Sequence, residues 1–140
     1  MVSLAELRKK SVALLEENNI EEARADTDFL LFFLTGATKS DIVSGRKMIA
    51  DDTEKKFSEA LIRRIKGEPV QYITGVCEFM SLEFTVNSST LIPRADTEIL
   101  VEECIRLIEE NGLENILDIG TGSGCIGLSI AHYCDNVNIK

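Results

Sequence analysis

The sequence predicts an α/β fold in three consecutive parts: an N-terminal all-α helical bundle, a linking β-hairpin and the start of a doubly wound parallel sheet. Apolar residues recur at helical spacing through 1–67 and alternate with polar residues through 76–86. A short apolar run at 116–119 then leads into a glycine-rich turn. We therefore expect a helical domain at 1–67, a hairpin linker at 68–94 and the beginning of a sheet domain at 95–140.

The first part is expected to contain three main helices. Ser3 and Glu6 have the spacing of a capping box, in which each side chain accepts an N–H at the start of a helix. Asn19 and Glu22 repeat that spacing and predict the start of a second helix. A third helix is predicted from Asp51 onward, where acidic residues open an amphipathic segment. The expected helix ends are Asn18, Gly36 and Gly67.

The linker is expected to be extended and to form a hairpin. Pro69 prevents the third helix from continuing, and the following Tyr72-Ile-Thr is rich in strand formers. Alternation on both sides of Met80-Ser81 predicts a hairpin that buries one row of side chains. That row consists of Phe79, Leu82, Phe84 and Val86. A helix capped by Asp96 and ended by Gly112 should follow, with Leu100, Val101, Cys104, Leu107 and Ile108 on its inner face.

The central feature is a strand, a glycine loop and a helix. Ile116, Leu117 and Ile119 predict a short buried strand. Three alternate glycines, Gly120, Gly122 and Gly124, then allow positive φ and a close approach of a ligand to the backbone. An apolar helix follows, and its free N-terminal N–H groups point back toward the loop. This arrangement predicts a binding site for a small molecule.

Two glycine patterns overlap in this loop. Residues 122–127 satisfy the dinucleotide spacing G-x-G-x-x-G, which is weak evidence when it stands alone. In that motif the first glycine closes the strand, and here the glycine that closes the strand is Gly120. When the motif is counted from Gly120, its third glycine position is occupied by Cys125, so the dinucleotide motif fits poorly. Asp118 would repel a pyrophosphate and suit a cationic ligand. A nucleotide site and a βα turn without a ligand remain the alternatives.

Composition excludes several classes of function. The formal net charge of −9 argues against a protein that holds nucleic acid through its phosphates. The four cysteines form no C-x-x-C pair and there is one histidine, which argues against a zinc site. Free thiols and the absence of a signal peptide indicate a cytoplasmic protein, and the apolar run at 29–34 is too short to cross a bilayer. We expect no metal, no membrane and no direct nucleic-acid partner.

Four blocks of sequence together resemble the release-factor glutamine N5-methyltransferases. These blocks are Gly67-Glu-Pro-Val-Gln-Tyr-Ile-Thr-Gly75, then Phe79 with Phe84-Thr-Val86, then Leu91-Ile-Pro-Arg-Ala-Asp-Thr-Glu98, and Asp118-Ile-Gly-Thr-Gly-Ser-Gly124. The last block also resembles the first motif of the class I S-adenosylmethionine-dependent methyltransferases. The chain departs from the family pattern at Ala95-Asp96, where the family has Pro-Glu, and at Ser81, where it usually has Gly.

The resemblance implies a Rossmann-like class I methyltransferase domain that binds S-adenosyl-L-methionine. The matching cofactor residues are Gly120, Thr121, Gly122, Ser123 and Gly124, with Asp118 shaping the loop and favouring the cationic ligand. The acid that takes the ribose hydroxyls is expected just past Lys140, because residues 136–140 begin a second parallel strand. The sequence therefore predicts the N-terminal part of a longer protein. Arg94 is a candidate for the pocket mouth or a surface partner of Glu98.

The reaction implied is methylation of the side-chain amide of the glutamine in the Gly-Gly-Gln motif of peptide chain release factors. The helical bundle would engage the release factor. In the family an Asn-Pro-Pro-Tyr motif activates the amide, but these 140 residues contain no such motif, so no catalytic residue is assigned. The alternatives are a methyltransferase acting on an adenine-type nucleobase amine and a binding module without activity of its own.

Overall fold

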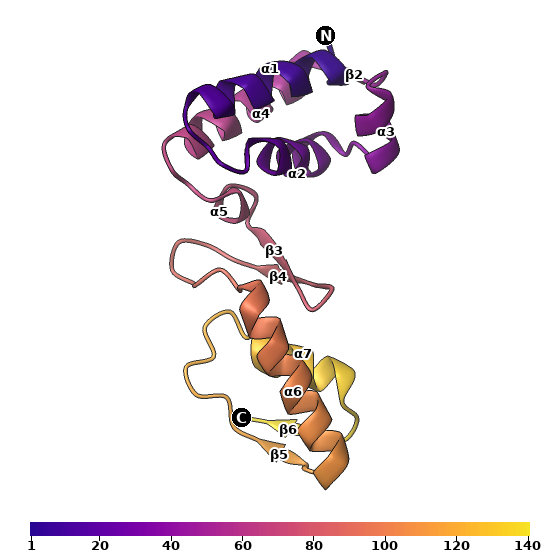
Figure 1. Cartoon of the computed structure of the whole chain (residues 1–140), viewed down its shortest axis with the longest axis vertical. Helices are drawn as coiled ribbons and strands as arrows, with labels where there is room; N and C mark the ends of the chain where they lie inside the picture. Colours follow the sequence, from indigo (N-terminus) through magenta and orange to yellow (C-terminus); the bar gives the residue numbers. More distant parts are fainter. The chain divides into compact units, whose positions relative to one another are not determined.

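The structure, a computed structural model, describes all 140 residues and contains two compact units (Figure 1). The first unit comprises residues Met1–Thr74 and the second comprises Gly75–Lys140. Helices dominate the first unit, whereas the second combines two helices with short two-stranded sheets. None of the helices has both the length and the apolar composition that a membrane crossing requires.

The first unit consists of five helices and a short antiparallel ribbon. The helices are α1 (Leu4–Glu17), α2 (Ala23–Thr35), α3 (Lys39–Ser44), α4 (Asp51–Ile65) and α5 (Val70–Thr74). The ribbon pairs β1 (Val2–Ser3) with β2 (Met48–Ile49), and Val2 lies opposite Ile49. Sequence patterns did not predict this ribbon, because two-residue strands carry no periodic signal.

The N-terminus of α1 is capped as predicted, but only on one side. Ser3 Oγ accepts the N–H of Glu6 at 3.2 Å, which confirms the predicted start. The reciprocal half of the capping box is absent, because the Glu6 carboxylate pairs with Lys10 at 2.7 Å, one turn further along the helix. This (i, i+4) pair replaces the expected bond to the backbone.

Asn19 ends α1 and does not begin α2, so the second predicted cap is wrong. Its φ is +59°, and its N–H donates to the carbonyl of Glu16 at 3.0 Å. The N–H of Ile20 donates to the carbonyl of Leu15, also at 3.0 Å. These two bonds form a Schellman motif, for which Asn is the usual substitute for Gly. Helix α2 begins three residues later than expected, without a side-chain cap.

The segment after α4 is a helix and not the predicted strand. Gly67, with φ +93°, follows the end of α4 as expected. The carbonyl of Pro69 then accepts the N–H groups of Tyr72 at 3.0 Å and Ile73 at 3.1 Å, which initiates α5. Proline fits the first turn of a helix because that turn needs no N–H from it. The strand propensity of the next residues is therefore overridden.

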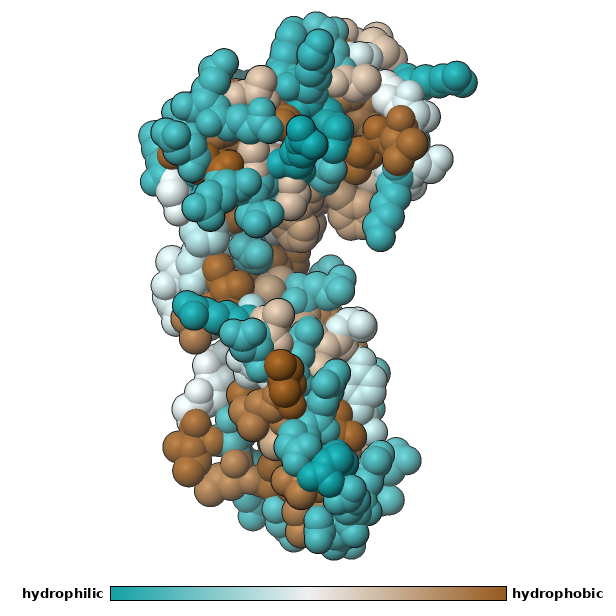
Figure 2. Space-filling view, in the orientation of Figure 1, coloured by the Kyte–Doolittle hydropathy of each residue, from teal (hydrophilic) through white to brown (hydrophobic).

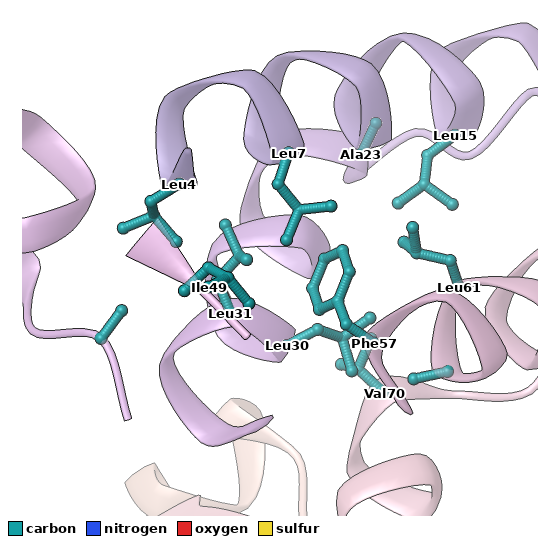
Figure 3. Close-up of a cluster of buried hydrophobic side chains, with 12 residues drawn as sticks. Leu4, Leu7, Leu15, Ala23, Leu30, Leu31, Ile49, Phe57, Leu61 and Val70 are labelled. Carbon is teal, nitrogen blue, oxygen red and sulfur yellow. The ribbon is translucent and has the colours of Figure 1, made fainter. Parts of the chain in front are cut away.

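Side chains from α1, α2 and α4 fill the core of the first unit (Figure 3). The ring of Phe57, which is fully buried, lies between Leu7 of α1 and Leu30 of α2. Leu15 of α1 faces Leu61 of α4 at one end of the cluster. The apolar rows of these helices therefore meet in one cluster, except that Leu14, which was expected on the inner face of α1, is 39% exposed.

The second unit begins with the predicted hairpin. It contains β3 (Val76–Phe79), β4 (Leu82–Thr85), α6 (Ala95–Asn111), β5 (Asn115–Ile116), α7 (Cys125–Tyr133) and β6 (Asn138–Ile139). Strands β3 and β4 pair across Met80-Ser81, with Phe79 opposite Leu82. Phe79, Phe84 and Val86 are buried and Leu82 is partly buried, so the expected row faces the core. Strands β5 and β6 are parallel, and α7 connects them.

Helix α6 departs from the prediction at its start and along one side. Arg94 is the N-cap residue and Asp96 lies in the first turn, where an acid is still favoured by the helix dipole. Val101 and Ile108 are buried as predicted, but 52% of Leu100 and 40% of Leu107 is exposed. The buried stripe is therefore narrower than the apolar pattern suggested.

The apolar run at the glycine loop is only partly buried, which corrects the prediction of a buried strand. Leu117 is 69% exposed and Ile119 is 85% exposed. Strand β5 ends at Ile116, so both residues lie beyond it, whereas the Asp118 carboxylate lies against Gly127 of α7. The rest of residues 1–140 leaves both apolar side chains exposed. Hydrophobic side chains accordingly reach the surface of the second unit (Figure 2).

Candidate functional site

The glycine loop adopts the backbone conformation that its sequence requires. The φ angles of Gly120, Gly122 and Gly124 are +78°, +58° and +79°. A Cβ at Gly120 would meet no atom within 4 Å, so this glycine is required by its φ angle and not by space. The N–H of Gly124 donates to the carbonyl of Thr121 at 2.8 Å and closes a tight turn. The loop thus presents backbone groups and small side chains just before α7.

Gly127 has a different role, because it lets α7 approach the sheet. A Cβ at this position would lie 3.0 Å from Cγ2 of Ile139 and 3.2 Å from Oδ2 of Asp118. The third glycine of the overlapping dinucleotide pattern therefore serves helix–strand packing. Glycines in that position pack helices closely whichever ligand is bound, so Gly127 does not favour a nucleotide.

Asp118, which precedes the glycine loop, has one carboxylate oxygen without a hydrogen-bond partner. Its Oδ2 is buried and has no hydrogen-bond partner, while its backbone N–H donates to the carbonyl of Lys140 at 2.8 Å. A buried acceptor without a donor is costly, and such groups are exceptional in folded proteins. This oxygen lies against Gly127 of α7, where solvent does not reach it.

Two pockets flank the loop, and Thr121 lines both. The first has a volume of about 260 Å³ and lies beside β6 and α7. Its lining consists of Asp118, Thr121, Gly124, Gly127, Leu128, Ala131, Ile139 and Lys140. The second has a volume of about 210 Å³ and lies between the loop and the segment before α6. Its lining consists of Leu91, Ile92, Pro93, Arg94, Thr97, Gly120, Thr121, Gly122, Ser123, Cys125 and Ile126.

Cations are scarce in the second unit, and their placement is uneven. Residues 75–140 contain eleven acidic residues but only three basic ones, Arg94, Arg106 and Lys140. Arg106 is engaged by Glu103 and Glu110 on α6. Arg94 forms no ion pair, and Glu98 instead accepts the N–H of Met80 at 2.6 Å. Arg94 is therefore not the surface partner of Glu98 and remains free at its pocket.

Cys77 of the hairpin is a buried thiol that lines neither pocket. Burial raises the pKa of the Cys77 thiol, and nearby Cys125 adds a smaller effect in the same direction. Cys77 thus stays protonated at neutral pH and is a poor nucleophile. No group of three or more His, Cys, Asp or Glu residues could hold a metal ion. The charged residues that line the two pockets are Asp118 and Lys140 at the larger one and Arg94 at the smaller one.

The structure brings together all the site residues predicted from the sequence. Asp118 and Thr121 line the larger pocket, and residues 120–123 line the smaller one. Sequence reasoning missed the residues of the opposing walls, above all Thr97, Leu128 and Ile139. The Leu91-Ile-Pro-Arg block was the available signal for one wall, because a distinctive motif outside any regular element suggests a site.

The chain is similar to known proteins over most of its length. A family model described as "PrmC N-terminal domain" matches residues 6–75. Three curated relatives carry the name "Release factor glutamine methyltransferase". The Clostridium acetobutylicum protein is 39% identical over 131 residues, which is 93% of this chain and 46% of the relative. The Fusobacterium nucleatum protein is 41% identical over 125 residues, which is 88% of this chain and 35% of the relative. The Moorella thermoacetica protein is 34% identical over 139 residues, which is 99% of this chain and 49% of the relative.

The chain spans about half or less of the length of these relatives. The matched region includes both the helical unit and, in the longer alignments, the glycine loop, since one alignment covers 99% of the chain. The family model alone matches half of the residues. On these findings, the chain belongs to the release factor glutamine methyltransferase family and carries its PrmC N-terminal domain.

Proposed function

We propose that the complete gene product transfers a methyl group from S-adenosyl-L-methionine to the glutamine amide of the Gly-Gly-Gln motif in peptide chain release factors. The names of the relatives support the substrate class. The observation that carries the cofactor assignment is the glycine loop between two pockets, of which one is lined by the unpaired cation Arg94 and the other by the acid Asp118. The release factor and the motif rest on the family.

The fold around the loop supports a Rossmann-like class I sheet that begins within residues 95–140. Strand β5, helix α7 and strand β6 form a parallel βαβ unit, the repeating element of doubly wound sheets. In such sheets ligands bind outside the carboxyl ends of the strands, where the loop and both pockets lie. We assign recognition of the release factor to residues 1–67 and the linking role to residues 68–94.

The two pockets fit the two ends of S-adenosyl-L-methionine. Arg94 is the cation in the smaller pocket and, with the hydroxyl of Thr97, would take the carboxylate of the methionyl end. The larger pocket combines polar Asp118 with apolar Leu128 and Ile139, as a nucleoside requires. Thr121 lies between them. The excess of acids over bases in this unit favours a cationic ligand and disfavours a pyrophosphate.

The cofactor, when bound, supplies an electrophilic methyl group on a positively charged sulfur. An amide nitrogen is a poor nucleophile, because its lone pair is delocalised into the carbonyl, so orientation in line with the methyl group must supply much of the rate. Residues 118–124 would hold the donor in place and the Leu91–Arg94 segment would close one side of it. No residue here is assigned to activating the amide.

The experiment is a labelled-methyl transfer assay on the complete gene product. The substrates are a release factor, the same factor with its Gly-Gly-Gln glutamine replaced by alanine, and total RNA. We expect label in the first substrate only, and peptide mass spectrometry should place one methyl group on the glutamine. Label in RNA alone would favour the nucleobase alternative, and labelling of the alanine variant would refute the assigned site.

A further inference from the structure

The turn of the β3–β4 hairpin is built from residues that do not favour it. Met80 and Ser81 have φ angles of +50° and +57°, yet neither is glycine. Two-residue turns with positive φ at both positions prefer Asn-Gly, because other side chains clash with the backbone there. Any residue other than glycine is strained in this region, because its Cβ lies too close to the backbone. Something else in the unit must hold the turn.

Two side chains from different helices hold the same residue. The Glu98 carboxylate on α6 accepts the N–H of Met80 at 2.6 Å. The Tyr133 hydroxyl on α7 donates to the carbonyl of Met80, also at 2.6 Å. Hydrogen bonds that involve a charged group are shorter and stronger than neutral ones, so the contact from Glu98 is the stronger of the two. Together these bonds form a clamp on Met80.

The clamp connects the two sides of the smaller pocket. Glu98 lies one helical turn after Arg94, at the start of α6, and the segment before it forms one wall of the pocket. Tyr133 is the last residue of α7, whose first residues lie at the opposite wall with the glycine loop. The hairpin also contacts the first wall directly, since Sγ of Cys77 lies 3.9 Å from the carbonyl oxygen of Pro93.

We propose that Glu98 and Tyr133 are positioning residues, which hold the Leu91–Arg94 wall in register with the glycine loop by way of the hairpin turn. The identity of the ligand in this inference rests on the proposed function. The competing explanation is that the clamp only offsets the strain of the turn and contributes to stability alone. The two explanations predict different ligand affinities once the strain is removed by another route.

The first test removes the clamp in the complete gene product. Glu98→Ala and Tyr133→Phe each delete one bond, whereas Glu98→Gln keeps a carbonyl that can accept from Met80. We expect the dissociation constant for S-adenosylhomocysteine, measured by calorimetry, to rise about tenfold in Glu98→Ala and to stay within about twofold in Glu98→Gln. Hydrogen exchange of the amides at 94–98 should accelerate in the Glu98→Ala variant without ligand.

The second test separates positioning from stability. Ser81→Gly relieves the left-handed strain and should raise the melting temperature. In the double variant Ser81→Gly with Glu98→Ala, the melting temperature should recover while the dissociation constant stays raised. Recovery of both would overturn the proposal, and so would unchanged exchange at 94–98 in Glu98→Ala. If the unmodified protein binds no S-adenosylhomocysteine, the proposed function fails, but the exchange measurement still decides whether the clamp orders the wall.

Discussion

Replacing Arg94 by alanine should weaken binding of the amino-acid end of the cofactor and nothing else. Arg94 is the single cation lining the smaller pocket, and no carboxylate of the chain engages it. A hydrogen bond to a charged group contributes about 1.5–3 kcal/mol. Since Arg94 is exposed and water screens its charge, the lower end of that range applies. This corresponds to an increase of about tenfold in the dissociation constant.

The assay compares two thioether ligands by calorimetry on the complete gene product. S-adenosylhomocysteine carries the carboxylate, whereas 5′-methylthioadenosine lacks the entire amino-acid end and keeps the nucleoside. Arg94→Ala should raise the dissociation constant of the first and leave that of the second unchanged. Arg106→Ala is the matched control, because this arginine of the same unit is held by Glu103 and Glu110. An equal loss for both ligands would refute the assignment of Arg94 to the carboxylate.

Three further predictions concern stability, each read from urea unfolding. Ser129→Ala removes a buried hydroxyl without a partner, so it should raise the free energy of unfolding by about 1 kcal/mol; a decrease would contradict this. Asp26→Asn weakens the 2.7 Å ion pair with Arg64, which is largely buried, and should lower the free energy of unfolding by about 2–3 kcal/mol. Glu110→Gln weakens an exposed ion pair with Arg106 and should lower it by less than about 0.5 kcal/mol, so similar losses in the two variants would contradict the prediction. Hydrogen bonds from the backbone N–H and the hydroxyl of Thr38 lower the pKa of Asp41 below 3.8 in the folded protein. Asp41 therefore stabilises the fold above pH 3.8, and this stabilisation is lost as the pH falls through the lower pKa of the folded state. Asp41→Asn should reduce the slope of the free energy of unfolding against pH in this acidic range, and an unchanged slope would disprove the role.

The features that the sequence predicted correctly are those set by neighbouring residues. Gly36 and Gly112 end α2 and α6 in the left-handed conformation, because glycine adopts it without a steric cost. The hairpin appears in the predicted register, since alternation over eight residues leaves one way to bury a single row. The positive φ angles of the glycine loop arise in the same way. Such local rules need no knowledge of the rest of the chain.

The failures occur where two local rules compete or where distant segments meet. Asn19 satisfies both a helix start and a helix end, and the choice falls to the end because α1 offers the free carbonyls of Leu15 and Glu16. Pro69 both stops one helix and begins another. Such cases cannot be ranked from spacing alone, because each pattern is compatible with two structures whose relative energies depend on packing elsewhere.

The candidate site shows the same division between local and distant information. The loop itself could be predicted, since its glycines and the acid before them occupy nearby positions in the sequence. For the opposing wall the sequence offered only Arg94 as a candidate and left its role open, because its distance from the loop depends on the placement of α6, which contacts the hairpin through Glu98, as α7 does through Tyr133. Ligand specificity is therefore not a property of the glycine motif alone. If the clamp sets this wall, two proteins with identical loops could differ in cofactor affinity through a hairpin turn more than thirty residues away in sequence.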